Sequence, residues 1–466
     1  MAARCGGVQC RQASLRVSVA KEGAQTQALV RLTPASLRAF GGEPAPGLAE
    51  HAASGISFHS GRLKTGEAFF ALPGEQMHGL AFAEDALAKG AAFIISDKPH
   101  PQGVVVPDPA GLLLELGQLA RRERSGAVTG ITGSVGKTSA KTFAAAALAA
   151  DKSPGNFNTP LALAKVFINT ALAKRAERAL VLELGIDHVG EMDNLTRLTE
   201  PDYGLLTHVG ASHLEQLETV ATVAFEKSRL LVAAKRRAFV SEQALGEFKK
   251  NLDIDLSALK AKGLTSYGFS EAAQARGHFE DGVLHYKDVS LRPPAQGRAM
   301  ALNALGALVL AEALGVPLGE AAKRVEEAKL EPGRLQTLDL GGLTVLNDSY
   351  NSNPSSAAEA LEILLALPGP HTAVLGDMLE LGQESARYHF ELGVKSRAAE
   401  RVIAIGQGAK QIALANSKAR YFASTELAVP ALRGLPLAGT VLLKASRGMH
   451  FERLLDALQQ AAEGAA

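Results

Sequence analysis

The sequence predicts an α/β protein of three domains, and two observations lead to that prediction. The chain has 466 residues, which is more than one hydrophobic core usually holds, so two or three domains are expected. Short apolar stretches of strand length alternate with longer helical stretches along most of the chain. That alternation is typical of α/β domains built on parallel sheets.

The composition excludes several classes of protein. The 49 basic and 48 acidic residues leave a formal net charge of +1, so nothing indicates a nucleic acid or an anionic membrane as partner. No apolar run reaches the roughly 18 residues of a membrane span, and the N-terminal residues lack the apolar stretch of a secretory signal. Cys5 and Cys10 are too few for a disulfide scaffold or a zinc site. We therefore expect a cytoplasmic protein with free thiols.

The alternation falls into three blocks, which we take as domains: residues 1–107, 108–328 and 329–466. In the first block, strands in 66–74 and 91–96 flank a helix near 81–89, which predicts an α/β domain.

The second block predicts a domain with a parallel sheet. Apolar strands are expected at residues 127–132, 181–185 and 203–209. A more β-rich stretch at 237–292 and a closing helix at 302–314 follow them.

The third block predicts a doubly wound, Rossmann-like sheet. Strands are expected at 343–348, 372–377, 401–406 and 440–445, with helices at 355–367, at 386–399, after 406 and at the C-terminus.

The strongest local pattern is TGSVGKT at residues 132–138, between an apolar strand and an Ala-rich helix. In that context Gly133 and Gly136 let backbone N–H groups converge on phosphate oxygens, next to the positive end of the helix. Lys137 would neutralise the β- and γ-phosphates, and the hydroxyl of Thr138 would hold Mg²⁺. The usual spacing needs glycine where the chain has Ile131, so the loop is a shorter variant. A glycine-rich turn without a ligand is the alternative.

Three further residues are candidates for a metal site in the central domain. Glu183 ends a strand expected beside the phosphate-loop strand, where an oxygen ligand would suit Mg²⁺, although a solvated carboxylate is the alternative. His213 follows another strand and competes with His208, and a lone histidine is more often structural. Lys227 lies in an expected helix, where an ordinary lysine would face solvent.

The C-terminal block contributes Arg334 and a polar loop, which starts at Asp348 directly after a strand and ends at Pro354 before a helix. Arg334 could reach a phosphate, and Asp348 a ribose or a metal-bound water. A loop that only connects domains is an equal alternative.

Taken together, these motifs resemble the Mur ligase family from about Ser57 to Arg447. The quoted motifs are TGSVGKT, GNFNT, VLELG, ASHLE, EKSRL, NALGALVLAEALG, EPGRLQ, NDSYNSNPSSAAEAL, LGDMLELG and LLKASRGM. The resemblance explains the missing glycine at 131, since the family has its own short phosphate loop. DSYNSNP and LGDMLELG are similar to the branch that adds D-alanyl-D-alanine, and the DNPR-type motif of the branch that adds the third stem residue is absent.

The resemblance implies a set of site residues. ATP contacts are implied for Gly133, Ser134, Val135, Gly136, Lys137, Thr138, Ser139, Asn303, Arg334 and Asp348. Catalytic roles are implied for Lys137, Glu183, His213 and Lys227, with Mg²⁺ held by Thr138, Glu183, His213 and a carbamylated Lys227. Substrate contacts are implied for Ser60, Asn156, Asn158, Thr159, Asn351, Asn353 and Ser355.

This sequence departs from the family pattern in two places. The branch usually has Asp-Ser-Arg where this chain has His59-Ser60-Gly61, followed by Arg62, so the contacts to uridine diphosphate there cannot be carried over residue by residue. The family often has Gly-x-His-Asn upstream of Asn303, where this chain reads Gly297-Arg298-Ala299-Met300.

The implied activity is ATP-dependent ligation of D-alanyl-D-alanine to UDP-N-acetylmuramoyl-tripeptide by a monomeric enzyme of peptidoglycan precursor synthesis. The alternatives are a ligase for the third stem residue, a folylpolyglutamate synthase, or a nucleotide-dependent binding module. A GTPase switch would need an N-K-x-D motif, which the chain lacks.

Overall fold

The computed structural model describes residues 31–251, 263–433 and 439–465. Two compact units are present: the first runs to Arg124 and includes Ala164–Arg175, and the second holds the remaining residues. Cys5 and Cys10 lie outside the described residues. The domain boundaries after residues 107 and 328 stay a prediction.

The first unit is built on a five-stranded sheet in the order β1-β5-β4-β3-β2. All neighbouring strands are parallel except β1 and β5. Phe69 and Ile94 pack from the sheet against Ala83 and Ala86 of helix α2. The elements are β1 (Glu43–Pro44), β2 (Gly55–Ser57), β3 (Glu67–Phe70), α2 (Ala83–Ala88), β4 (Ile94–Ser96), β5 (Gly103–Val105) and α3 (Pro109–Arg122).

The second unit contains a seven-stranded sheet in the order β12-β11-β10-β9-β6-β8-β7, with every neighbouring pair parallel. Its strands are β6 (Val128–Thr132), β7 (Asp151–Lys152), β8 (Leu180–Glu183), β9 (Tyr203–Leu206), β10 (Arg237–Ser241), β11 (Leu264–Gly268) and β12 (Ala275–Arg276). Its helices are α4 (Lys137–Ala147), α5 (Pro160–Leu172, which continues into the first unit), α6 (Glu191–Thr199), α7 (Leu214–Leu217), α8 (Val220–Ala233), α9 (Glu242–Asn251), α11 (Arg298–Ala313) and α12 (Leu318–Glu326).

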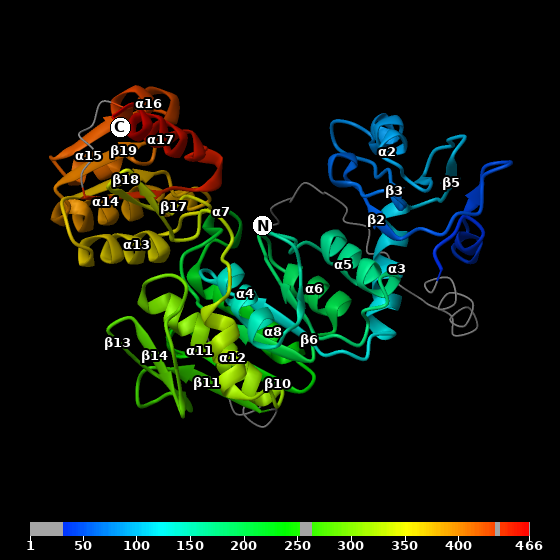
Figure 1. Ribbon diagram of the computed structural model, residues 1–466, viewed down its shortest axis with the longest axis horizontal. Helices are drawn as coiled ribbons and strands as arrows, with labels where there is room; N and C mark the ends of the chain where they lie inside the picture. The colour runs from blue at the N-terminus through cyan, green and yellow to red at the C-terminus, as the bar shows by residue number, and fades with distance from the viewer. Residues whose placement is uncertain (1–30, 252–262, 434–438, 466) are drawn as a thin grey trace, which may run out of the picture. The chain divides into compact units, whose positions relative to one another are not determined.

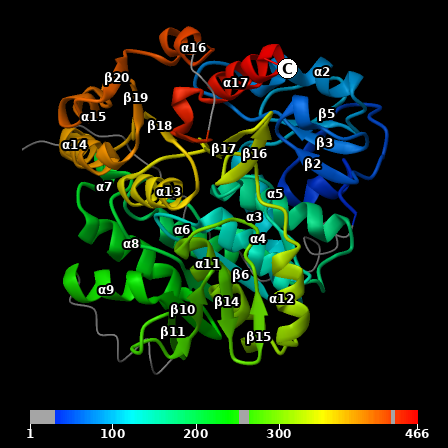
Figure 2. The same ribbon diagram turned by 60° about the vertical axis from the view of Figure 1, so that its left-hand side comes forward.

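The two faces of this sheet are covered by different helices (Figure 2). Leu205 joins the core formed with α4 and α11, whereas its neighbour Leu206 joins the core formed with α8 and α9. Successive strand residues point to opposite faces, so both must be apolar in a sheet covered on both sides. A small antiparallel sheet, β13 (His278–Glu280), β14 (Val283–Tyr286) and β15 (Val289–Leu291), accompanies it.

A six-stranded sheet in the order β16-β17-β21-β18-β19-β20 lies toward the C-terminus. Only the pair β16 and β17 is antiparallel. Helices α13 and α14 lie on one side and α16 and α17 on the other (Figure 1). The elements are β16 (Gln336–Leu340), β17 (Leu343–Asp348), α13 (Pro354–Ala366), β18 (His371–Gly376), α14 (Ser385–Lys395), β19 (Arg401–Ile405), α15 (Lys410–Ala415), β20 (Ala419–Phe422), α16 (Thr425–Arg433), β21 (Gly439–Lys444) and α17 (Glu452–Ala465).

The predicted α/β class with parallel sheets is confirmed, and two predicted helix boundaries are wrong. The helix expected at 302–314 begins at Arg298, because the positive φ of Gly297 ends the preceding segment. The helix expected at 386–399 ends at Lys395 and gives way to a 3₁₀ turn over Ser396–Ala398. No helix among the described residues is long and apolar enough to cross a membrane.

Candidate active site

The phosphate loop joins the end of β6 to the start of α4. Gly136 has φ 82° at the N-terminus of α4, and a Cβ there would lie 2.7 Å from Nδ2 of Asn303. A Cβ at Gly133 would lie 2.1 Å from Oγ1 of Thr207, so both positions exclude a side chain. Nζ of Lys137 donates to the carbonyl of Gly133 at 2.6 Å. The side chain of Lys137 thus lies against the loop at the N-terminus of α4. A glycine-rich loop with a lysine at a helix N-terminus is the arrangement that binds phosphate.

A carboxylate lies directly beside this loop. Strand β8 pairs with β6, with Ile131 opposite Glu183. Oε2 of Glu183 accepts a hydrogen bond from Oγ1 of Thr138 at 2.9 Å and lies 3.3 Å from Nζ of Lys141. Lys141, which is fully buried, also donates to the carbonyl of Gly155, at the start of the GNFNT segment. A hydroxyl and a carboxylate thus meet where a nucleotide-bound cation would need oxygen ligands.

His213 lies at the N-terminal end of α7 and faces two carboxylates. Its Nδ1 is 2.7 Å from Oε2 of Glu380 and 3.0 Å from Oδ1 of Asp187. Burial opposes the charged imidazolium, but these two carboxylates outweigh it, so the pKa of His213 is raised above its ordinary value. The competing candidate behaves oppositely: burial, with smaller contributions from Lys137 and Lys227, lowers the pKa of His208 to about 4.

Lys227 does not face solvent, as an ordinary helix lysine would. Its side chain is fully buried in α8, and its Nζ has no hydrogen-bond partner among the described residues. Burial lowers the pKa of Lys227 well below its ordinary value, the charge of Lys137 lowers it further, and Asp187 opposes the shift. The neutral amine therefore forms more readily than in an exposed lysine.

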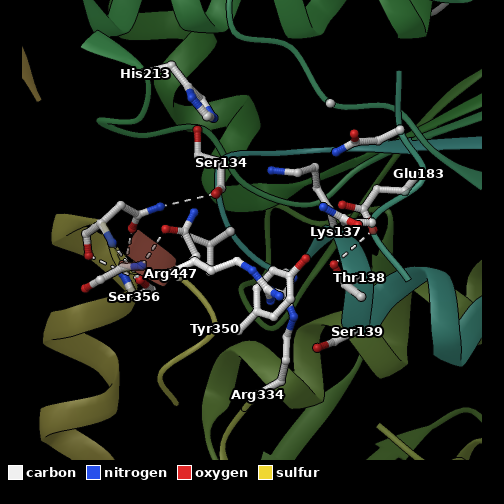
Figure 3. A pocket seen from close by; sticks show the side chains of 18 of the residues that line it. Ser134, Lys137, Thr138, Ser139, Glu183, His213, Arg334, Tyr350, Ser356 and Arg447 are labelled. Carbon is white, nitrogen blue, oxygen red and sulfur yellow. Dashed lines mark hydrogen bonds between the residues drawn. The ribbon is translucent and has the colours of Figure 1, made fainter. Parts of the chain in front are cut away.

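Residues near the C-terminal sheet complete the site (Figure 3). The guanidinium carbon of Arg334 lies 4.0 Å from the ring centre of Tyr350, and that of Arg447 lies 5.1 Å from the same ring. Asp348 uses both carboxylate oxygens: one accepts from the backbone N–H of Leu335 and the other lies 2.6 Å from Nζ of Lys444. Both guanidinium groups thus lie near the ring of Tyr350 on the cavity wall, where they could bind anionic groups.

The loop before α13 reaches the phosphate loop. Asn353 caps α13 by accepting from the backbone N–H of Ser356, and its Nδ2 donates to the carbonyl of Ser134 at 3.2 Å. Ser355 differs, because it lines a separate pocket with Tyr388 and Lys395. The prediction that Ser355 binds the dipeptide therefore gains no support from its position.

Most of the predicted residues line one cavity of about 440 Å³ in the second unit. These are Ser134, Val135, Gly136, Lys137, Thr138, Ser139, Asn156, Asn158, Thr159, Glu183, His213, Asn303, Arg334, Asp348, Asn351 and Asn353. Gly133 and Lys227 are not on its wall. The cavity is also lined by six residues that no sequence pattern singled out: Asp187, Tyr350, Glu359, Glu380, Lys444 and Arg447.

Ser60 belongs to the first unit, in a 3₁₀ turn over Ser60–Arg62. Its hydroxyl helps to lower the pKa of Asp85, after the larger contribution of Lys89. In the same unit Nζ of Lys165 donates to Oγ of Ser57 at 3.2 Å. A cation thus lies beside the segment where the usual motif is missing.

Fold and site together define a ligase of a known class. The Mur ligase middle-domain model matches residues 131–311, the Mur ligase glutamate ligase domain model matches 333–448, and the catalytic-domain model of the family matches 53–110. Together these matches span about three quarters of the chain, in the order of its three large sheets. The chain belongs to the Mur ligase family.

Within that family the chain is similar to D-alanyl-D-alanine ligases over most of its length. The chain is 29% identical to UDP-N-acetylmuramoyl-tripeptide–D-alanyl-D-alanine ligase of Escherichia coli (strain K12), over 86% of this chain and 92% of the relative. A crystal structure of MurF from Acinetobacter baumannii has TM-score 0.78 and 26% identity and covers 94% of this chain and 98% of that one. MurF ligase from Thermotoga maritima in complex with ADP has TM-score 0.74 and 25% identity, over 88% and 98%.

Proposed function

We propose that this chain is an ATP-dependent ligase that joins D-alanyl-D-alanine to the free carboxylate of UDP-N-acetylmuramoyl-tripeptide. The observation that carries the proposal is the single cavity that combines the phosphate loop, the Thr138–Glu183 pair and the polar loop Asp348–Asn353. The names of the similar proteins supply the substrates, since the Escherichia coli relative is named for this ligation and the Thermotoga maritima structure holds ADP.

The chemistry follows from the charges in the cavity. A carboxylate is a poor acyl donor, so its oxygen first attacks the γ-phosphorus of ATP, which releases ADP and leaves an acyl phosphate. The dipeptide amine then attacks the acyl carbon, and the tetrahedral intermediate expels phosphate to leave an amide. Lys137 and Arg334 would offset the anionic charge as carboxylate and triphosphate meet, and the polar loop would orient the amine.

The site also fits a divalent cation. Thr138 and Glu183 offer hard oxygen ligands side by side, and the unpartnered amine of Lys227 is suited to become a carbamate. No group of three or more His, Cys, Asp or Glu residues in the described parts of the chain forms a metal site by itself. In the proposed site, Mg²⁺ would be held by Thr138, Glu183, His213 and a carbamylated Lys227, together with substrate phosphates. Bound Mg²⁺ would neutralise phosphate charge.

The first prediction concerns that cation. Glu183→Gln and His213→Ala are expected to raise the Mg²⁺ concentration needed for half-maximal activity by about tenfold, with a smaller change in the KM for the tripeptide substrate. The reason is that glutamine lacks the negative charge of Glu183, and the methyl group of alanine cannot coordinate a cation as an imidazole nitrogen can. The measurement is activity against Mg²⁺ concentration, with His208→Ala as the matched control. An unchanged midpoint in His213→Ala would assign His213 a structural role instead.

The proposed substrates have a direct test. Phosphate release from ATP is measured with UDP-N-acetylmuramoyl-tripeptide, alone and with D-alanyl-D-alanine, and in parallel with UDP-N-acetylmuramoyl-dipeptide plus diaminopimelate and with a folate plus glutamate. We expect only the tripeptide with D-alanyl-D-alanine to give release stimulated by more than about tenfold. Stimulation by diaminopimelate or glutamate would instead assign the chain to the third-residue ligases or the folylpolyglutamate synthases, and release without any amine would indicate a nucleotide-dependent switch. A cytoplasmic location and a monomeric state remain predictions.

A further inference from the structure

One segment of the cavity wall does not match the family pattern noted in the sequence. Where the family often has His-Asn upstream of Asn303, this chain has Ala299 and Met300, and both line the cavity. Neither side chain can form a conventional hydrogen bond to the edge of a purine base. Any base bound against this wall must therefore find its polar partner elsewhere.

A carboxylate from α13 reaches this wall. Oε1 of Glu359 accepts a hydrogen bond from the backbone N–H of Ala299 at 2.7 Å. Glu359 lines the same cavity, and its second oxygen, Oε2, has no hydrogen bond from any of the residues that the structure describes. Asp348 differs, because both of its oxygens are already engaged by Leu335 and Lys444.

The surroundings suit the flat face of a base. Met300 and Ala360 are buried apolar residues that line the cavity beside Glu359. Asn303, three residues beyond Met300 on α11, touches the phosphate loop at Gly136. Helix α11 therefore runs from Asn303, at the phosphate loop, to Ala299, which bonds to Glu359. One end of this stretch would lie at the phosphates of a bound nucleotide and the other at its base.

We propose that Glu359 selects adenine as the base of the nucleotide, by accepting a hydrogen bond from the exocyclic amine of adenine. The inference rests on the proposed function, since it takes ATP as the nucleotide. A carboxylate oxygen is an acceptor only, so it favours the amino group of adenine over the carbonyl oxygen that hypoxanthine has at the same position. Burial raises the pKa of Glu359, the Ala299 N–H opposes the shift, and a donor from the base would favour the ionised form further.

The test compares ATP with inosine triphosphate in wild type and in Glu359→Gln. A glutamine would keep its amide oxygen on the Ala299 N–H and turn its NH₂ group, a donor, toward the base. For the Glu359→Gln enzyme, the ratio of kcat/KM for ATP to kcat/KM for inosine triphosphate is expected to fall by about tenfold to a hundredfold. The variant is also expected to use inosine triphosphate better than wild type does. Glu359→Ala should lose the preference without gaining use of inosine triphosphate. Glu362→Gln, an exposed glutamate on the same helix, is the matched control and should keep the wild-type ratio.

Binding of ADP and inosine diphosphate, measured by calorimetry, separates the two proposals because it needs neither the tripeptide nor the dipeptide. Suppose that wild type binds ADP, and that Glu359→Gln is shown to be folded by its thermal unfolding. If this variant then keeps the wild-type preference within about twofold, the role of Glu359 is wrong and the ligase proposal stands. If wild type binds neither nucleotide, the proposed function itself fails. An unfolded Glu359→Gln leaves Glu359→Ala to decide, since an unchanged preference there also overturns the inference.

Discussion

Replacing Lys137 with alanine is expected to reduce ligation by at least about a hundredfold to a thousandfold while the protein stays folded. The lysine sits inside the phosphate loop, with its Nζ 2.6 Å from the carbonyl of Gly133. Its charge is where phosphoryl transfer builds up negative charge, so the substitution removes stabilisation of the transition state. Burial lowers the pKa of Lys137, Glu183 opposes the shift, and a bound triphosphate would favour the ammonium form.

The measurement is steady-state ligation, with thermal unfolding to show that the variant is folded. Lys323→Ala, which removes an exposed lysine from α12, is the matched control and should behave as wild type. Turnover like that of wild type in a folded Lys137→Ala protein would contradict the assignment of the phosphate loop.

Replacing Lys227 with alanine is expected to abolish activity almost as completely, and a short carboxylic acid in the buffer is expected to restore part of it. A carbamate forms from a neutral amine and carbon dioxide with loss of a proton, and the buried, unpartnered Nζ of Lys227 has its pKa well below the ordinary value. The product is an anion in place of a cation. An added carboxylate would occupy the vacated position.

Two variants distinguish this account from simple loss of packing. Lys227→Arg keeps a long, positively charged side chain and cannot become a carbamate, so it should stay inactive with or without the acid. Rescue that occurs equally in Lys137→Ala, or normal activity in Lys227→Arg, would show that no carbamate is needed. The ligase proposal would survive either outcome, because it rests mainly on the phosphate loop and the polar loop after Asp348.

The parts of the site that the sequence could predict are contiguous or follow from sheet geometry. The phosphate loop needs only glycines, a lysine and a threonine between a strand and a helix, and these occur together at residues 132–138. Glu183 could be placed beside the loop because carboxyl ends of parallel strands meet at one edge, and β8 does pair with β6.

The remaining residues act through contacts between distant parts of the chain. Lys141 looks like one more polar residue of an Ala-rich helix, yet it is fully buried and bridges Glu183 and Gly155. Glu359 lies in a helix rich in Ala and Leu, and only the structure shows that it bonds to Ala299 and lines the cavity. No local pattern encodes a partner 60 residues away. The sign of the His213 pKa shift likewise depends on Asp187 and Glu380, which come from other segments.

The most direct test of the account is the fate of the substrate's carboxylate oxygens. UDP-N-acetylmuramoyl-tripeptide is labelled with a heavy oxygen isotope in its terminal carboxylate and incubated with the enzyme, ATP and D-alanyl-D-alanine. The masses of the released phosphate and of the peptide product are then measured by mass spectrometry. If the carboxylate attacks the γ-phosphorus and an amide forms at the acyl carbon, each released phosphate carries one labelled oxygen and the peptide gains the dipeptide. Unlabelled phosphate, or phosphate released without a new amide, would contradict ligation through an acyl phosphate.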